Sequence, residues 1–275
     1  MAGRRDKIFY FTADGDAFAP TGFARSHWGP DHLNGPAIVG LAARELERRH
    51  GSPDFRPARL TVDLFRAARG RPTVVRTALV RDGRRVRNAT CEVIQDDNVV
   101  AAATLVLFRH SESPPGQLWS AEQPFDPPAA PVFSPDSLRP YTNSADAGWT
   151  DTVSAHQNAS RKAFFNHSID VVGGHRNTAF VNAAVLAEAT SLVTNMGTAG
   201  VGFINGDLTV ALARMPVDDW IGVQADSHLD ADGIAVGTAT LYDRAGAFGS
   251  GMVTAIANPA AQIDFTRSEF EGFRI

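Results

Sequence analysis

The chain has 275 residues, of which 44% are hydrophobic and 20% are charged, and its formal net charge is −4 at pH 7. This composition predicts a globular protein with a sizeable buried core, and the charge argues against binding nucleic acid through bulk electrostatics. The longest apolar run, residues 99–108, is too short to span a bilayer, and the N-terminal residues do not resemble a secretory signal. The single cysteine, Cys91, excludes an internal disulfide, so we expect a cytoplasmic protein with no membrane segment.

The first predicted elements are one helix and four strands. Residues 37–51 (AIVGLAARELERRHG) carry apolar side chains at helical spacing, Pro36 fits the first helical turn, and Gly51 fits the end of the helix. Strand-like runs follow at residues 60–64, 73–82, 84–95 and 98–108, separated by turn-forming sequences.

The second half of the chain repeats this order. Asn177 and Thr178 can cap one helix through residues 179–196, which Gly197 ends, and strands follow at residues 204–214, 220–229, 234–243 and 247–257. Residues 111–140 contain eight of the sixteen prolines and predict an extended connector. We therefore expect an N-terminal unit at 1–110, a Pro-rich linker at 111–140 and a C-terminal unit at 141–275.

A repeated heptapeptide supports this division. Residues 60–66 read LTVDLFR and residues 208–214 read LTVALAR, so five of seven positions are identical at an offset of 148. Matched turns and matched element order indicate a duplicated α+β unit. Because the second helix is apolar on most sides, it must be buried, and a curved antiparallel sheet wrapped around each helix would bury it.

Three segments resemble a known family. They are DGDAFAPTGFARSHWGPDHLNGP at residues 14–36, ARLTVDLFR, and above all FINGDLTVALARMPVDDWIGVQADSHLDADGIAVGTATLYDRAGAFG at residues 203–249. They are similar to the acyl-CoA thioesterase II-like double-hotdog proteins, especially their actinobacterial branch. The resemblance implies a double hotdog fold, hydrolysis of an acyl thioester by direct water attack, and association into homo-oligomers.

The resemblance also implies a set of catalytic residues. The family places an Asp on the second helix, a Thr or Ser before the following strand and a Gln on the last strand. These positions fall at or next to Glu188, near Asn205, and on Val253 or Thr254. Glu188 has an alternative role as a carboxylate paired with an arginine for structural reasons. At the 148-residue offset Glu188 corresponds to Gly40, so only one of the two related positions carries an acid.

The start of the first helix is the candidate substrate-binding region. Its free N–H groups suit a thioester oxygen or a phosphate, and His32, Asn34 and Gly35 would line it, although Asn34 could equally serve only to cap the helix. The sequence has no H-E-x-x-H pattern, no G-x-S-x-G elbow and no nucleotide-binding glycine motif, so we expect no metal and no cofactor.

Two functional hypotheses follow. The first is a thioesterase that acts on acyl-CoA or on acyl groups held by an acyl-carrier protein, with Glu188, Asn205 and Thr254 as catalytic residues. The alternative is a protein that binds an acyl thioester without hydrolysing it, or that transfers or rearranges the acyl group in a biosynthetic pathway. The missing Gln and the Glu in place of Asp favour the alternative.

Overall fold

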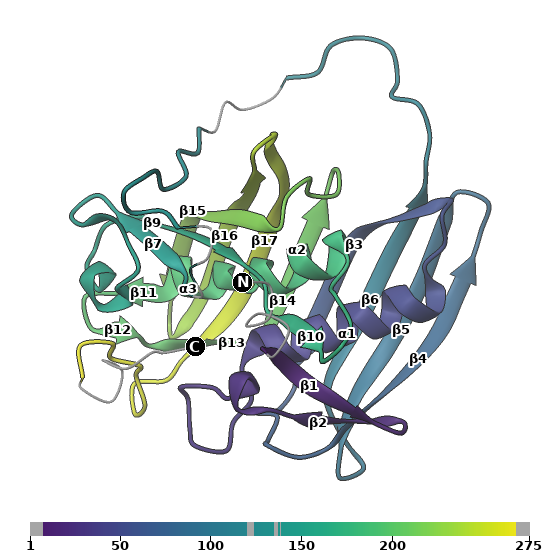
Figure 1. Ribbon diagram of the computed structural model, residues 1–275, viewed down its shortest axis with the longest axis horizontal. Helices are drawn as coiled ribbons and strands as arrows, with labels where there is room; N and C mark the ends of the chain where they lie inside the picture. The colour runs from purple at the N-terminus through teal and green to yellow at the C-terminus, as the bar shows by residue number, and fades with distance from the viewer. Residues whose placement is uncertain (1–7, 120–123, 135–136, 138, 268–275) are drawn as a thin grey trace.

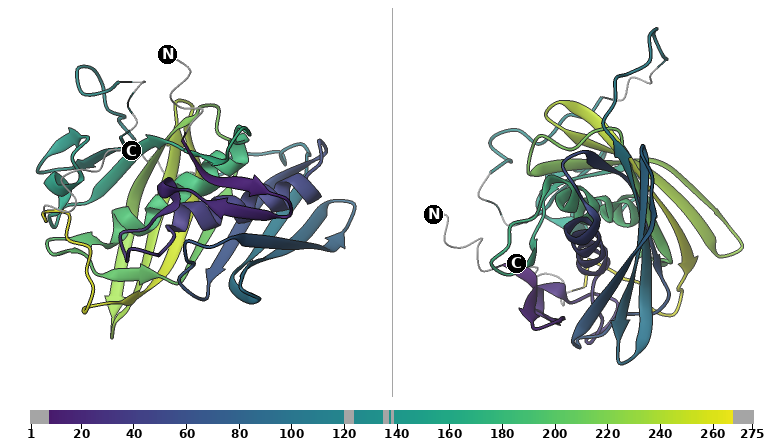
Figure 2. Two further views of the ribbon diagram at one scale, coloured as in Figure 1. Left: turned by 60° about the horizontal axis from the view of Figure 1, so that its bottom comes forward. Right: turned by 90° about the vertical axis from the view of Figure 1, so that its right-hand side faces the viewer.

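One large β-sheet forms most of the protein, and α-helices lie against its concave face (Figure 1). The structure is a computed structural model and describes residues 8–119, 124–134, 137 and 139–267. The largest sheet contains fifteen strands, and the main helices pack within its curve, as the right-hand view of Figure 2 shows. The protein is therefore of the α+β class, as the sequence predicted.

The first half of the chain contains one long helix and six strands. A short 3-10 turn, η2 (Gly22–Ala24), precedes the helix. The elements are β1 (Phe9–Asp14), β2 (Ala17–Pro20), α1 (Gly35–His50), β3 (Phe55–Leu64), β4 (Thr73–Asp82), β5 (Val86–Gln95) and β6 (Asn98–Arg109). The predicted helix and the four predicted strands are all confirmed.

The second half contains two shorter helices and a longer series of strands. The elements are β7 (Tyr141–Ser144), β8 (Gly148–Thr150), η3 (Val153–His156), β9 (Lys162–His167), β10 (Asp170–Val172), α2 (Ala179–Ala187), α3 (Ala189–Asn195), β11 (Met196–Gly197), β12 (Gly200–Val201), β13 (Phe203–Asn205), β14 (Asp207–Leu212), β15 (Trp220–Ala231), β16 (Ile234–Asp243) and β17 (Gly246–Ala257).

The repeated heptapeptides lie side by side where the two halves meet. Strands β3 and β14 pair antiparallel, and Thr61 is the direct partner of Thr209. The two hydroxyl oxygens of these residues are 3.0 Å apart. Copies of one strand that pair antiparallel at equivalent residues are related by an approximate two-fold axis, which passes between these two threonines.

A second contact between the halves lies at the opposite edge of the first-half strands. Strand β10 pairs in parallel with β1, with Phe9 opposite Asp170 and Phe11 opposite Val172. Strand β1 is thus held by β2 from its own half and by β10 from the other half.

Helix α1 begins and ends at the predicted residues. The Asn34 side chain accepts a hydrogen bond from the Ala37 N–H at 2.9 Å, Pro36 lies in the first turn, and Gly51 follows the last helical residue. Within the helix, a Cβ at Gly40 would lie 2.7 Å from methyl groups of Val171 and Val185. Glycine at this position therefore allows β10 and α2 to approach α1 closely.

The second-half helix differs from the prediction. The sequence predicted one helix over residues 179–196, whereas the structure has α2 and α3, which meet at Glu188. Helix α2 runs antiparallel to α1. Its start lies near the end of α1, where the Thr178 hydroxyl donates a 2.6 Å hydrogen bond to Glu47. Glu188, at the end of α2, lies against Gly35 at the start of α1.

The Pro-rich segment docks on the second half through aromatic side chains. Phe125 stacks on Tyr242 with ring centroids 4.7 Å apart, and the Trp149 indole N–H donates to the Asp126 carbonyl oxygen at 2.9 Å. A Cβ at Gly222 would come within 2.3 Å of the Phe125 ring, so glycine makes room for the stack.

Part of the family-like segment 203–249 forms an ion pair with a buried carboxylate. Both guanidinium ends of Arg214 donate to the Asp243 carboxylate, at 2.6 and 2.7 Å, and that carboxylate also accepts from the Val217 and Ala245 amides. Burial alone would raise the pKa of Asp243, but these donors lower it. Arg214 thus pairs with Asp243, and neither residue lines the cavity described below.

Candidate active site

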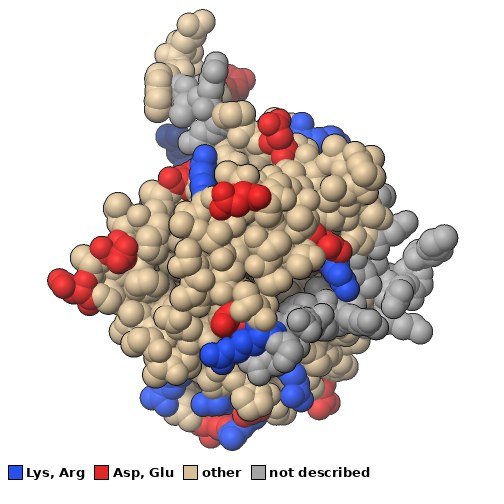
Figure 3. Space-filling model, turned by 90° about the vertical axis from the view of Figure 1, so that its left-hand side faces the viewer, with Lys and Arg blue, Asp and Glu red and all other residues tan. Residues whose placement is uncertain are grey.

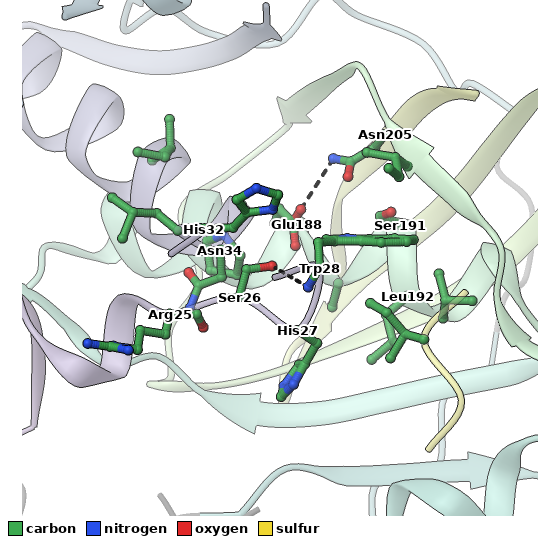
Figure 4. A pocket seen from close by; sticks show the side chains of 18 of the residues that line it. Arg25, Ser26, His27, Trp28, His32, Asn34, Glu188, Ser191, Leu192 and Asn205 are labelled. Carbon is green, nitrogen blue, oxygen red and sulfur yellow. Dashed lines mark hydrogen bonds between the residues drawn. The ribbon is translucent and has the colours of Figure 1, made fainter. Parts of the chain in front are cut away.

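A cavity of about 1470 Å³ opens between the start of α1, the α2–α3 junction and strand β13. Its wall includes five of the six predicted site residues: His32, Asn34, Gly35, Glu188 and Asn205. Where the cavity borders the helices, most of its other lining residues are apolar. Figure 4 shows these side chains around one part of the cavity.

Glu188 places a carboxylate at the α2–α3 junction. Its Oε1 atom accepts a hydrogen bond from the Asn205 side-chain N–H at 3.2 Å (Figure 4). A Cβ built on Gly35 would lie 2.0 Å from the same oxygen, so only glycine permits this contact. No arginine or lysine of the described chain pairs with Glu188, and its Oε2 atom has no hydrogen-bond partner there.

The surroundings of Glu188 change its acidity. Burial raises its pKa from the usual value of 4.5 to about 7, and the Asn205 hydrogen bond opposes this rise only in part. The side chain is partly exposed to the cavity, but it is removed from bulk water, which disfavours the charged form. A carboxyl group with a pKa near neutrality can gain and lose a proton during catalysis.

The start of α1 lies beside this carboxyl group. Asn34 caps the helix, and its side-chain N–H also donates to the Phe23 and Arg25 carbonyl oxygens at 3.1 and 3.2 Å. The Gly35 N–H has no acceptor within the part of the chain that the structure describes. A free amide at a helix N-terminus can stabilise negative charge on a substrate oxygen.

His32 lies on the cavity wall just before this turn. Its ring packs over Gly29, where a Cβ would be 3.2 Å from Nδ1. Burial lowers the pKa of His32, and the positive charge of Arg69 lowers it further, against the opposing effect of Asp31. The imidazole is therefore neutral at neutral pH.

Thr254, the sixth predicted residue, lies apart from the others. Its backbone N–H donates to Asp207 Oδ1 at 2.8 Å and its hydroxyl donates to Asp207 Oδ2, and it does not line the cavity. Val253 is fully buried in the hydrophobic core. A catalytic role for Thr254 therefore has no support from this geometry.

Tyr10 is a site residue that the sequence did not reveal. It lies on β1, is 6% exposed and lines the cavity. Burial raises the pKa of its hydroxyl, and the nearby Glu188 carboxylate raises it further. The surrounding residues, IFYF, form an ordinary aromatic strand pattern, so no motif marked this tyrosine.

Other kinds of site are not apparent in the described residues. None of their helices is both long and apolar enough to cross a membrane, and no three His, Cys, Asp or Glu side chains among them are placed to hold a metal ion. On the face in Figure 3, basic and acidic side chains are interspersed.

Two family models of acyl-CoA thioesterase domains match this chain. A family model for the acyl-CoA thioesterase N-terminal domain matches residues 24–108, and a model for the C-terminal domain matches residues 115–252. The chain belongs to the acyl-CoA thioesterase family. No curated protein matches it by sequence.

Solved structures share this fold at low sequence identity. The tesB protein of Mycobacterium avium subsp. paratuberculosis is 17% identical, with a TM-score of 0.66 over 94% of this chain and 100% of that one. A conserved protein with a hot dog fold from Alicyclobacillus acidocaldarius is also 17% identical, with a TM-score of 0.65 over 93% and 98%. The acyl-CoA thioesterase II TesB2 of Mycobacterium marinum is 14% identical, with a TM-score of 0.59 over 96% and 100%.

Proposed function

We propose that the protein hydrolyses acyl thioesters of coenzyme A, or of the pantetheine arm of a carrier protein, by direct attack of water. The observation that carries this proposal is Glu188, a carboxyl group without a cationic partner in the described chain, which lines a large cavity with a pKa of about 7. The side-chain amide of Asn205 holds Glu188, and the N–H of Gly35 would bind the thioester oxygen.

In the proposed reaction, Asn205 hydrogen-bonds Oε1 of Glu188, which packs against Gly35, and Oε2 remains to accept a proton from water. The water oxygen bonds to the thioester carbon, and the carbonyl electron pair moves to oxygen, where the Gly35 N–H stabilises it. The C=O bond then re-forms, the C–S bond breaks, and the thiolate takes the proton from Glu188. No covalent acyl-enzyme is formed.

The cavity supports an acyl chain of considerable size. Its volume of about 1470 Å³ exceeds that of a usual small-molecule pocket, ~300–1,000 Å³. Ile38 of α1, Val185 and Leu186 of α2, and Leu192 of α3 provide apolar wall beside Glu188. We propose that the acyl group lies along these helices, with His32 near the thioester.

The test is thiol release from a panel of acyl-CoAs, from acetyl to palmitoyl. We expect Glu188→Gln to lose activity about 100-fold or more, as for a removed general base. Glu45→Gln is the matched control, because Glu45 is a buried glutamate on α1 that does not line the cavity. If no acyl-CoA or acyl-carrier protein is hydrolysed by the wild type, the proposal is wrong.

A specific observation favours the alternative, a protein that binds or rearranges acyl thioesters without hydrolysis. The side chains of Val253 and Thr254, where the family places a Gln, provide no group to the cavity wall. This alternative predicts saturable binding of an acyl-CoA in calorimetry together with no thiol release at any pH.

We also propose that the chain is built of two tandem hotdog units, at 1–110 and 141–275, joined by the linker at 111–140. The paired threonines at the β3–β14 junction and the antiparallel α1 and α2 support this division. Association into a homo-oligomer remains a prediction, which light scattering of the purified protein can test.

A further inference from the structure

Tyr10 brings a hydroxyl group to the wall of the cavity. The side chain is 6% exposed, and no described residue donates a hydrogen bond to its hydroxyl or accepts one from it. The hydroxyl oxygen is not one of the fully enclosed, unpartnered polar atoms of the described residues, so it is open to the cavity. An acyl group bound in the cavity can reach this hydroxyl, because Tyr10 lines the cavity.

A short series of hydrogen bonds ties Tyr10 to the start of α1. The Tyr10 carbonyl oxygen accepts from the Thr21 N–H at 2.8 Å, and Thr21 begins the η2 turn. The carbonyl oxygen of Ala24, at the end of that turn, accepts from the Asn34 N–H at 2.8 Å. Tyr10 and the free Gly35 amide are thus connected through hydrogen-bonded backbone.

Tyr10 also lies within electrostatic reach of Glu188 without being bonded to it. Burial, and then the negative charge of Glu188, raise the pKa of the tyrosine hydroxyl, so it stays protonated at physiological pH. The single hydrogen-bond donor to the Glu188 carboxylate in the described chain is Asn205. The Tyr10 hydroxyl is therefore a neutral hydrogen-bond donor near the general base, and it is not hydrogen-bonded to that base.

We propose that Tyr10 is a catalytic residue, whose hydroxyl donates a hydrogen bond to the thioester carbonyl oxygen and, together with the Gly35 N–H, holds the oxyanion. This inference rests on the proposed function for its kinetic consequence. Tyr10 keeps its proton throughout the reaction, because the water proton moves to Glu188 and then to the leaving thiolate. Two donors from adjacent parts of the first half would thus face an acid from the second half.

Kinetics of Tyr10→Phe provide the first test. Loss of one oxyanion donor should lower kcat about 100-fold. KM should be unchanged, and the rise of kcat with pH should occur at the same pH as in the wild type. The variant should fold, because only a hydroxyl without a protein partner is removed. Tyr141→Phe is the control: Tyr141 is 3% exposed, and its hydroxyl bonds the Ser134 backbone away from the cavity. Unchanged kcat in Tyr10→Phe would overturn the inference.

A spectroscopic test separates this inference from the proposed function. Butyryl-CoA and decanoyl-CoA carrying ¹³C at the thioester carbonyl would be bound to Glu188→Gln protein, in which the thioester stays intact. We expect difference infrared spectra to place the bound carbonyl band at lower frequency than the free one. Adding Tyr10→Phe should remove most of that displacement, and adding Tyr141→Phe should leave it.

The outcomes are distinct. If the wild type hydrolyses nothing while Tyr10→Phe still abolishes a displaced carbonyl band, the proposed hydrolysis fails and the Tyr10 contact stands. If hydrolysis depends on Glu188 but Tyr10→Phe changes neither the carbonyl band nor kcat, the inference alone fails. If neither thioester gives a displaced band, the inference is overturned as well.

Discussion

Helix α1 and the α2–α3 segment each carry an inward-facing glutamate, and the two carboxylates have opposite surroundings. Glu45 on α1 is 1% exposed and contacts Arg44, Arg48 at 2.8 Å and Arg49 at 3.5 Å. Burial alone would raise its pKa, but Arg48, and then the other two arginines, lower it overall. Glu188 has an amide instead of these cations, and its pKa rises to about 7.

The comparison shows how one residue type serves structure in one place and chemistry in another. Three guanidinium groups fix Glu45 as an anion, and it faces no cavity. The protonation of Glu188, in contrast, can change near neutral pH, because no neighbouring cation of the described chain holds it in the charged form. The arginine-paired role that the sequence left open for Glu188 belongs to Glu45.

The largest expected effect separates the two glutamates by activity. Glu188→Gln should lower kcat/KM for the best acyl-CoA about 100-fold or more, whereas Glu45→Gln should stay within about twofold of the wild type. Steady-state thiol release at pH 8 measures both. Equal losses of activity in the two variants would mean that Glu188 supports the folded structure and does not take part in the reaction.

Stability should separate them in the opposite direction. Glu45→Gln should lower the free energy of unfolding by ~2 kcal/mol at pH 8, because three arginines lose their partner. Glu188→Gln should raise it by ~1 kcal/mol, because a buried group no longer has to ionise. Urea denaturation followed by circular dichroism measures both changes.

The pH dependence of these stabilities has a defined sign. The folded pKa of Glu188 is raised, so its contribution is complete below pH 4.5 and is lost as the pH rises to about 7. The folded pKa of Glu45 is lowered, so its contribution is present above the unfolded value of 4.5 and is lost as the pH falls through the folded pKa. A stability advantage of Glu188→Gln that grew below pH 4.5 would contradict this assignment.

Gly35→Ala should lower kcat about 20-fold, because its methyl group would displace the Glu188 carboxylate from the Asn205 amide and from the helix start. Gly197→Ala is the control, since nothing lies within 4 Å of a Cβ there and the residue does not line the cavity. Full activity in purified Gly35→Ala would show that the contact is dispensable.

Asn205→Ala should have the smallest effect, a loss of several-fold at pH 7. The Asn205 hydrogen bond lowers the pKa of Glu188, so removing it raises that pKa and moves the rising limb of kcat/KM to higher pH. Measurement from pH 5 to 9 would show partial recovery at the alkaline end. A limb that stays in place would remove Asn205 from contact with the base.

The strands that follow the helices, β3–β6 and β14–β17, were predictable from sequence, because their side chains alternate between polar and apolar and their turns have characteristic residues. Strands β4 and β16 have the predicted limits, and the heptapeptide repeat indicated that the halves are related. The break at Glu188 was not predictable, because every residue from 179 to 196 is compatible with a continuous helix.

Site residues that act through tertiary contacts were harder to foresee. Glu188 and Asn205 were found through a family resemblance, and the role of Gly35 in receiving Glu188 depends on how α1 and α2 pack. Tyr10 comes from a strand that β10 of the other half helps to hold, and nothing in its local sequence indicates that contact. The partner of Thr254 was missed because Asp207 lies on a neighbouring strand.

The β3–β14 junction has a consequence for how the two halves can change. Across that junction the first half provides the proposed donors, Tyr10 and Gly35, and the second half provides Glu188 and Asn205. Neither half needs to keep both roles, so Gly40 could become a packing residue in the first half while acid chemistry stayed in the second. A duplicated gene can specialise in this way, whereas a homodimer of identical units must place every substitution in both sites at once.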